Sequence, residues 1–438
     1  MKNKGFIMST YVYILLVFFL LLLGTMLVVL NNTRLLANKI KENTDGNIDF
    51  NLVLKGDKEI FIVKDSEYTE PGCIATTFDG EKLEVSVMGE VNAKKSGEYD
   101  IEYSAEYKGV EKKVKRKVIV GENLVTYITN LYEDSITRAS NNLKKDNTED
   151  KNIRYYGANP NNYVRFNNEL WRIIGIFGNN VKLIRNDRLG WLSWDTSEST
   201  VNSGYGINQW GESKDTSGNI YEGADLQVYL NKMYYGGIEV TCYNDLNNTK
   251  TTCPKDSNGN FLELDDVAKN LIDNHTWNIG AMRYISRTNT LTFYQAERGS
   301  VHGKSSCSSG NQCNDTIIRT TEWTGYIALP YVTDWAYASS ENDCNAKIDQ
   351  SSTYKCKNNN WMHHGTKMDM EDATWFMSSV ANPGAARHVW AVLGVGNVNG
   401  GSAAGPFSVF PTIYLKSNIL IESGNGTSSD PYVLKLGN

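Results

Sequence analysis

The feature that most constrains this chain is an uncharged run of twenty residues, Tyr11 to Leu30, close to its N-terminus. Twenty helical residues rise about 30 Å, which is the thickness of the hydrocarbon core of a bilayer. Lys2 and Lys4 precede the run and the bulk of the chain follows it, which predicts an N-terminus inside the cell. The pattern therefore predicts a single-pass cell-membrane protein with a transmembrane helix over residues 10–31 and its C-terminal domains outside the cell.

Residues 1–9 allow three interpretations. A cleavable signal peptide has a shorter apolar core, of about 7–15 residues, and a small-x-small cleavage site, and the sequence has neither. A plain membrane anchor is the second interpretation. The third rests on Lys-Gly-Phe directly before the apolar run, which resembles the leader of type IV prepilins and implies cleavage between Gly5 and Phe6, with pilin-like subunits as partners. Most prepilins have a glutamate where this chain has Thr10, which favours a filament-tip subunit or a plain anchor over a shaft subunit.

Residues 50–120 alternate apolar and polar side chains in short runs separated by turns that contain glycine. The order YTEPG, a DG turn, SG-x-Y-x-I-x-Y and V-x-R-x-V-x-V resembles bacterial immunoglobulin-like surface repeats. The resemblance implies an all-β immunoglobulin-like (Ig-like) sandwich that acts as a spacer or adhesion module. Cys73 is the single cysteine of this segment, and we interpret it as a small buried side chain, with an intermolecular bridge as the alternative.

The C-terminal region, residues 154–438, contains all ten tryptophans and long loops rich in Gly, Ser and Asn. Turns are predicted at Asn167-Asn168 and after Phe177, and helices at 224–235 and 264–274. The stretches NNYVRFNNELWRIIGIF, TGYIALPYVTDWAYAS and FPTIYLKSNILIESGNGTSSDPYVL look like a domain on surface proteins of Firmicutes and related bacteria. That domain is similar to C-type-lectin-like folds, which include formylglycine-generating-enzyme-like domains. The resemblance implies an α+β, loop-rich fold that binds on the surface of a Gram-positive bacterium.

The predicted organisation follows these changes in pattern along the chain. It consists of a cytoplasmic or leader segment (1–9), a transmembrane helix (10–31), a stem helix and linker (32–49), an Ig-like domain (50–120), a helical connector and linker (121–153) and a C-type-lectin-like domain (154–438).

Six cysteines form three close pairs in polar, loop-like sequence. No pair is a CxxC, and none has histidines at zinc-finger spacing, so a zinc site is not predicted. On an exported chain local disulfides are expected, and each short loop would contribute about 2–3 kcal/mol of stability. The predicted bridges are Cys242–Cys253, Cys307–Cys313 and Cys344–Cys356.

No catalytic residue, cofactor or metal site is predicted. Formylglycine-generating enzymes use a cysteine pair late in the domain, and no cysteine follows Cys356. KDTSGN (214–219) and KDSNGN (255–260) resemble calcium loops but lack the glutamate at the twelfth position, so we interpret both as polar β-turns. We interpret the adjacent His363 and His364 as a solvated loop feature. The net charge of −6 argues against a nucleic-acid partner.

Trp191 and Trp194 lie in a polar loop-like stretch and are the candidate ligand-binding residues. Exposed tryptophans can stack on sugar rings or anchor proteins, whereas the competing interpretation is that both fill the core. The sequence predicts a membrane- or pilus-mounted extracellular binding or adhesion protein, without catalysis, whose ligand is a glycan or a protein. The alternatives are a structural envelope or minor-pilin subunit without a specific ligand and, more remotely, an enzyme of the formylglycine-generating type.

Overall fold

The fold was derived from a computed structural model of the 438-residue chain. The structure describes residues 17–20, 22–23, 25–26, 29–30, 33, 49–196, 207–244, 250–283, 288–299, 317–340, 344, 348, 356–364, 368, 373–381 and 387–437.

The predicted fold class is wrong in two respects. Among the residues that the structure describes, no helix is long and apolar enough to span a bilayer, so the N-terminal transmembrane helix is not retained. Gly5 and Phe6, the predicted cleavage site, lie outside the described residues. The second respect is that the C-terminal region is mostly β-sheet with short helices, so the α+β lectin-like class is not retained either.

The chain forms two compact units. The first includes Glu67–Ala93 and Gly97–Ile119, together with the residues up to Ile60. The second includes Val120–Asn438, and the short segments Phe61–Ser66 and Lys94–Ser96 group with it.

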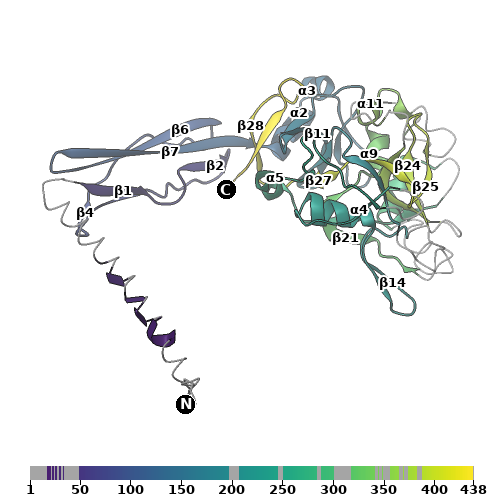
Figure 1. Cartoon of the computed structure of the whole chain (residues 1–438). Helices are drawn as coiled ribbons and strands as arrows, with labels where there is room; N and C mark the ends of the chain where they lie inside the picture. The colour runs from purple at the N-terminus through teal and green to yellow at the C-terminus, as the bar shows by residue number, and fades with distance from the viewer. Residues whose placement is uncertain are drawn as a thin grey trace, which may run out of the picture. The chain divides into compact units, whose positions relative to one another are not determined.

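The first unit is a β-structure in which short strands alternate with tight turns. Its strands are β1 (Phe50–Leu54), the first residues of β2 (Glu59–Val63), β3 (Cys73–Thr77), β4 (Lys82–Leu83), β5 (Ser86–Met88), β6 (Gly97–Tyr107) and most of β7 (Val110–Asn123). β1, β3 and β4 form one antiparallel sheet, and β5, β6 and β7 are neighbours in another. The long strands β6 and β7 run side by side in Figure 1. Lys108 and Gly109 join them with φ of 49° and 83°, the two positive values that a type I′ hairpin requires.

Apolar side chains from both sheets form the core of the first unit. Phe50, Ala75 and Ala105 are buried together at its centre. A polar contact crosses this interior, because the buried guanidinium of Arg116 pairs with Glu70, which also accepts a hydrogen bond from the Tyr103 hydroxyl. Pairing is what makes a buried arginine tolerable in a core of this size.

The second unit is built around one large sheet. Its strand order is β22-β27-β12-β11-β10-β29-β28, with β9 also paired to β11 and β8 to β9. The strand pairs of this sheet are antiparallel, except β10 with β29, which is parallel. The strands are β8 (Leu143–Lys145), β9 (Ile153–Tyr155), β10 (Tyr163–Phe166), β11 (Glu169–Phe177), β12 (Asn180–Arg185), β22 (Ile327–Ala328), β27 (Thr412–Tyr414), β28 (Ile419–Ser423) and β29 (Tyr432–Leu436).

Two predicted turns set the register of this sheet. Asn167 and Asn168 join β10 to β11 with φ of 53° and 57°, so they form the tight turn that the sequence predicts. Gly178, at φ 59°, begins the turn between β11 and β12. Both turns are short, so β10, β11 and β12 form a continuous meander.

A second sheet has the order β13-β26-β23-β24-β25, with β19 paired to β23. β24 and β25 lie side by side in Figure 1. Its strands are β13 (Gly190–Ser193), β19 (Ala281–Met282), β23 (Thr374–Val380), β24 (His388–Val392), β25 (Val398–Ser402) and β26 (Pro406–Val409). The smaller sheets contain β14 (Ser213–Asp215), β15 (Ile220–Tyr221), β16 (Cys242–Tyr243), β17 (Lys250–Thr251), β18 (His275–Asn278), β20 (Ile317–Ile318) and β21 (Glu322–Gly325).

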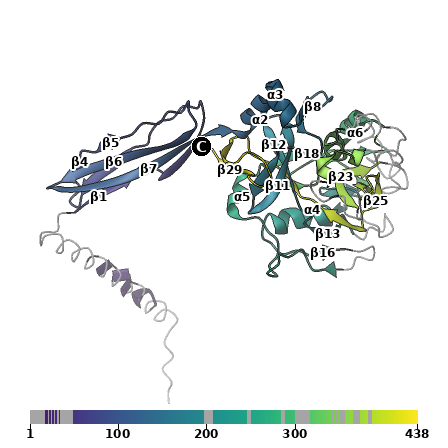
Figure 2. The same ribbon diagram turned by 90° about the horizontal axis from the view of Figure 1, so that it is seen from above.

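Short helices cover the sheets, and α2 packs against β12 and β28 (Figure 2). They are α2 (Leu124–Glu133), α3 (Ser135–Ser140), α4 (Asp225–Val228), the π-helix η1 (Tyr229–Tyr234), α5 (Asp266–Leu271), α6 (Thr290–Glu297), α9 (Val332–Tyr337) and α11 (Trp361–His364). The core between sheets and helices is rich in aromatic rings. Eight of the ten tryptophans are buried in it: Trp171, Trp194, Trp210, Trp277, Trp335, Trp361, Trp375 and Trp390.

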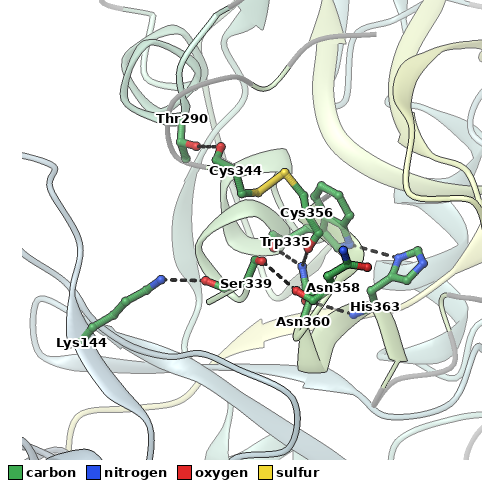
Figure 3. The surroundings of a disulfide bond; sticks show 9 residues. All are labelled: Lys144, Thr290, Trp335, Ser339, Cys344, Cys356, Asn358, Asn360 and His363. Carbon is green, nitrogen blue, oxygen red and sulfur yellow. Dashed lines mark hydrogen bonds between the residues drawn. A yellow bond between two sulfur atoms is a disulfide. The ribbon is translucent and has the colours of Figure 1, made fainter. Parts of the chain in front are cut away.

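Two of the three predicted disulfides are confirmed. Cys242–Cys253 links β16 to the residues after β17, and Cys344–Cys356 closes a loop of similar length. Figure 3 shows that Thr290 donates from its hydroxyl to the Cys344 carbonyl, 2.9 Å away, so the second bridge is tied to the start of α6. Cys307 and Cys313 lie outside the described residues. Cys73 is a half-buried free thiol whose Sγ contacts the Val53 carbonyl at 3.1 Å.

We expect peptide mapping of the unreduced chain to recover the Cys242–Cys253 and Cys344–Cys356 links, with Cys73 alkylated as a free thiol. Each bridge closes a short loop, so its local partner is the nearest sulfur in the folded chain. The matched control is the same digest after reduction, in which all linked peptides must disappear. Free thiols at the four bridged positions in folded, exported protein would contradict the pairing.

Candidate functional site

The exposed indole of Trp191 is the candidate ligand-contact surface of the second unit. The side chain is 46% exposed on β13, whereas the other nine tryptophans are buried or, for Trp323, half-buried. Its Nε1 donates a hydrogen bond to Ser408 Oγ, 2.8 Å away on the paired strand β26. The guanidinium carbon of Arg188 lies 4.1 Å from the ring centroid. The ring is thus fixed in orientation while much of it faces solvent.

The strand that carries Trp191 lies against the disulfide-linked hairpin of β16 and β17. A side-chain carbon added at Gly190 would come within 2.7 Å of Pro254 Cγ, so a glycine is needed for this close approach. Pro254 directly follows the bridged Cys253, so the hairpin next to the indole is cross-linked. We call the residues Arg188, Trp191, Pro254 and Ser408 the Trp191 face.

Trp194, the second predicted ligand-binding residue, lies in the core. It is fully buried, and its ring packs 5.3 Å from that of Trp210. The chain leaves β13 after Ser193, and the Trp194 amide donates to the Ala403 carbonyl at 2.8 Å. A buried indole offers no face to a ligand, so the prediction is corrected for Trp194. The structure does not bring the two tryptophans together in one site.

The two calcium-like stretches are polar turns, as predicted. Asp215 Oδ1 accepts from the amides of Ser217 and Asn219, each at 2.9 Å. Asp256 Oδ1 accepts in the same way from Asn258 and Asn260, also at 2.9 Å. These carboxylates therefore stabilise their own turns. In the described part of the chain, no group of three or more His, Cys, Asp or Glu side chains is placed to hold a metal ion.

His363 is a core residue, which corrects its interpretation as a solvated loop side chain. It is buried on α11, where its Nδ1 accepts from Trp335 Nε1 at 3.3 Å. Because Nδ1 accepts, Nε2 carries the proton and donates to the Gly394 carbonyl at 3.0 Å. Figure 3 shows the Trp335–His363 contact beside the Cys344–Cys356 bridge. The arrangement is that of a neutral histidine that joins α9 to a neighbouring loop.

A cluster of four charged side chains lies in the centre of the second unit, and sequence reasoning missed it. Arg154 on β9 donates to Asp146 Oδ2 at 2.7 Å and to Asp334 Oδ1 at 2.9 Å. Lys182 on β12 donates to Asp334 Oδ2 at 2.5 Å. The four side chains are at most 1% exposed and carry two positive and two negative charges, so the cluster is neutral as a whole. One sequence signal could have pointed to this cluster: Lys182 is a single charged residue between apolar neighbours in the strand VKLI (181–184).

Burial and pairing act in opposite directions on these groups. Burial alone would raise the pKa of Asp334, but Lys182 and Arg154 outweigh it and hold that pKa below its usual value. Burial lowers the pKa of Lys182 to about 8, although Asp334 opposes the shift. The ion pairs of the cluster therefore depend on one another, because removing one charge leaves its partner unpaired in a low-dielectric interior.

Glu297 lies next to this cluster at the end of α6. It is fully buried and accepts hydrogen bonds from the Thr333 hydroxyl at 2.6 Å and from the Ser378 hydroxyl at 3.1 Å. Burial raises its pKa to about 7, and the hydrogen bonds from Thr333 only partly offset that rise. The side chains of Asp146, Arg154, Lys182, Glu297 and Asp334 are all buried, whereas Arg298, whose NH1 lies 3.9 Å from Glu297 Oε2, is 18% exposed.

We expect Arg154→Ala to lower the free energy of unfolding of the second unit by about 3–5 kcal/mol, because Asp146 loses its buried cation. The measurement is urea unfolding followed by tryptophan fluorescence, which reports on this unit alone since all ten tryptophans belong to it. Arg165→Ala is the matched control: this arginine is exposed on β10, and its removal should cost less than about 0.5 kcal/mol. Equal effects of the two substitutions would contradict the role of the cluster.

We expect Glu297→Gln to flatten the pH dependence of stability. Folding raises the pKa from 4.5 to about 7, so the contribution of Glu297 is complete below pH 4.5 and is lost as the pH rises through 7. The glutamine variant should remove about 3 kcal/mol of this decline. Unfolding free energies measured from pH 5 to 8 test it, with the exposed Glu239→Gln as the control that keeps the wild-type slope. An unchanged slope in Glu297→Gln would refute the assignment.

Two solved structures show limited likeness to this chain. A lipoprotein from Bacteroides thetaiotaomicron is 31% identical over 17% of this chain and 39% of its own, with a TM-score of 0.16. The structure of the CBM51-2 and INT domains of ZmpB from Clostridium perfringens, in complex with GlcNAc, is 13% identical over 40% of this chain and 38% of its own, with a TM-score of 0.15. The chain thus spans less than half the length of either protein.

No curated protein matches the sequence of this chain. Residues 52–120 match the family described as bacterial surface protein, Ig-like domain. This match covers β2 to β6 and more than half of β1 and β7, and it confirms the Ig-like prediction for the first unit. The chain therefore carries the Ig-like domain of a bacterial surface protein, which supports an extracellular or surface location.

Proposed function

We propose that this chain is an extracellular binding protein in which the Ig-like unit is a spacer and the second unit binds a glycan or protein ligand through the Trp191 face. The observation that carries the proposal is the exposure of Trp191 in a unit that buries eight of its ten tryptophans. Tryptophan is enriched at binding hot spots, and among the ten tryptophans of the unit, all of which the structure describes, only Trp191 is exposed, with 46% of its surface open to solvent.

The construction of the Trp191 face suits a ligand with both apolar and polar groups. The indole offers a flat apolar surface, against which the C–H face of a sugar ring or an aliphatic side chain can pack. Its hydrogen bond to Ser408 fixes the ring before binding, so little side-chain freedom remains to be lost on association. The Arg188 guanidinium, whose central carbon lies 4.1 Å from the ring centroid, adds a positive charge beside the indole.

We propose binding without catalysis. Lys182 and Glu297, whose pKa values burial shifts to about 8 and about 7, are fully buried together with Asp334, so a substrate could not reach them without opening the core. The surface at Trp191 has no acid–base pair among its described contacts: its partners are a serine hydroxyl and a guanidinium. We therefore propose that this surface recognises a ligand and does not transfer a proton.

The test is binding of the purified chain to a glycan array and to bacterial and host cell-surface proteins. We expect Trp191→Ala to weaken binding to the ligand so identified by about tenfold or more, because a hot-spot tryptophan contributes about 2 kcal/mol or more. Ile220→Ala is the matched control, since this side chain is also exposed but lies on β15 in a different sheet. Unchanged affinity of Trp191→Ala would refute the site, and the absence of any glycan or protein ligand would refute the function.

A further inference from the structure

The side chains of Lys182 and Asp334 lie closer together than the usual nitrogen–oxygen distance of an ion pair, which is about 2.7–2.9 Å. They lie 152 residues apart in sequence, on β12 and α9, and both side chains are 0% exposed. The Nζ–Oδ2 distance is 2.5 Å. A carboxyl C–O bond is about 1.2 Å long, so the Asp334 Cγ lies within about 3.7 Å of the lysine nitrogen. Reacting atoms in near-attack arrangements are about 3–3.5 Å apart.

The surroundings of Lys182 suit a neutral nitrogen better than an ammonium group. An ammonium has three N–H donors, and the Asp334 carboxylate is the acceptor that Lys182 contacts in the described structure. Aromatic rings occupy the other directions, with centroids 4.1 to 5.3 Å from Nζ: Phe177, Trp277, Tyr331 and Tyr414. Ring faces attract a cation, but they replace its lost water only in part. An amide nitrogen has one N–H and no charge to solvate.

We propose that Lys182 Nζ and Asp334 Cγ condense to an intramolecular amide bond, which cross-links β12 to α9 in the core of the second unit. Nothing in the proposed binding function requires this bond, and the bond does not depend on that function. Its effect is mechanical and structural: a covalent link between a central strand and a helix keeps the core together when a surface protein is pulled through its bound ligand.

The reaction is a dehydration that needs no other reactant. A proton passes from Nζ to Oδ2 within the pair and leaves a neutral amine and a carboxylic acid, a transfer that a low-dielectric site favours. The amine lone pair attacks Cγ, and the electron pair of the C=O bond moves to Oδ1. The Cγ–Oδ2 bond then breaks, Oδ2 leaves as water with a second proton from Nζ, and the C=O bond re-forms. The products are one secondary amide and one water.

Arg154 is the positioning residue for this step. Its NH1 lies 2.9 Å from Oδ1, the oxygen on which negative charge develops when Cγ becomes tetrahedral. The Tyr331 amide donates to Oδ2 at 3.0 Å and so holds the carboxyl group with Oδ2 toward the lysine. The reaction removes one positive and one negative charge, and the Arg154–Asp146 pair that remains is still neutral.

The test is mass spectrometry of the full-length chain after reduction and denaturation. We expect the wild-type protein, or a fraction of it, to weigh one water molecule less than its sequence requires. A tryptic digest should contain a branched peptide in which residues 173–185 are joined to residues 320–347, because trypsin does not cleave after an acylated Lys182. Complete cleavage after Lys182, with a free peptide 173–182 and no branched species, would overturn the proposal.

Two variants and one control make the assignment specific. Lys182→Met and Asp334→Ala should each abolish the mass deficit. Lys144→Met should retain it, because this lysine is also largely buried but donates to the backbone carbonyl of Ser339. If a variant fails to fold, the wild-type peptide map still decides the question. If folded Lys182→Met still weighed one water molecule less than its sequence requires, the cross-link would lie elsewhere in the chain, and the proposed Lys182–Asp334 bond would be refuted.

Discussion

The second unit depends on one buried carboxylate, that of Asp334. Its Oδ2 accepts from the Tyr331 amide and so caps the start of α9, and the same carboxylate receives Arg154 from β9 and Lys182 from β12. A helix and two strands are thereby joined at one buried point. An uncompensated charge at such a point would cost several kcal/mol, so the three elements must come together for any of them to be stable. The aromatic rings around Lys182 close the site and exclude alternative partners.

The Trp191 face lies on β13 and β26 of the second sheet, and the packing around these strands makes it rigid. The hydrogen bond to Ser408, the close approach of Gly190 to Pro254 and the nearby Cys242–Cys253 bridge all restrict motion at this surface. A rigid aromatic surface loses little entropy on binding. The Ig-like unit has a small core around Phe50, Ala75 and Ala105, and residues 52–120 match a family of bacterial surface domains.

Several features could be predicted from the sequence because they depend on neighbours along the chain. Alternating side chains predicted the strands of the Ig-like unit, Asn167-Asn168 predicted a tight turn, and close cysteine pairs predicted the Cys242–Cys253 and Cys344–Cys356 bridges. The membrane span predicted from hydropathy over residues 10–31 is not supported, because no helix among the described residues is long and apolar enough to cross a bilayer. The helical spacing at 264–274 also overestimated the helix, because α5 ends at Leu271 and Ile272 leaves it to pair with Leu415.

By itself the sequence determined the local structure: turn positions, strand alternation, the partners of nearby cysteines and the Ig-like character of residues 52–120. Only the tertiary structure decided which tryptophan is exposed and which charges meet. Trp191 and Trp194 are three residues apart and chemically identical, yet the first is exposed and the second is buried. Trp191 lies on β13, paired with β26, whereas Trp194 follows the strand and packs against Trp210. Lys182 and Asp334 are 152 residues apart. Their contact results from the folding of the whole unit, since the energy of a buried pair depends on surroundings that distant segments supply.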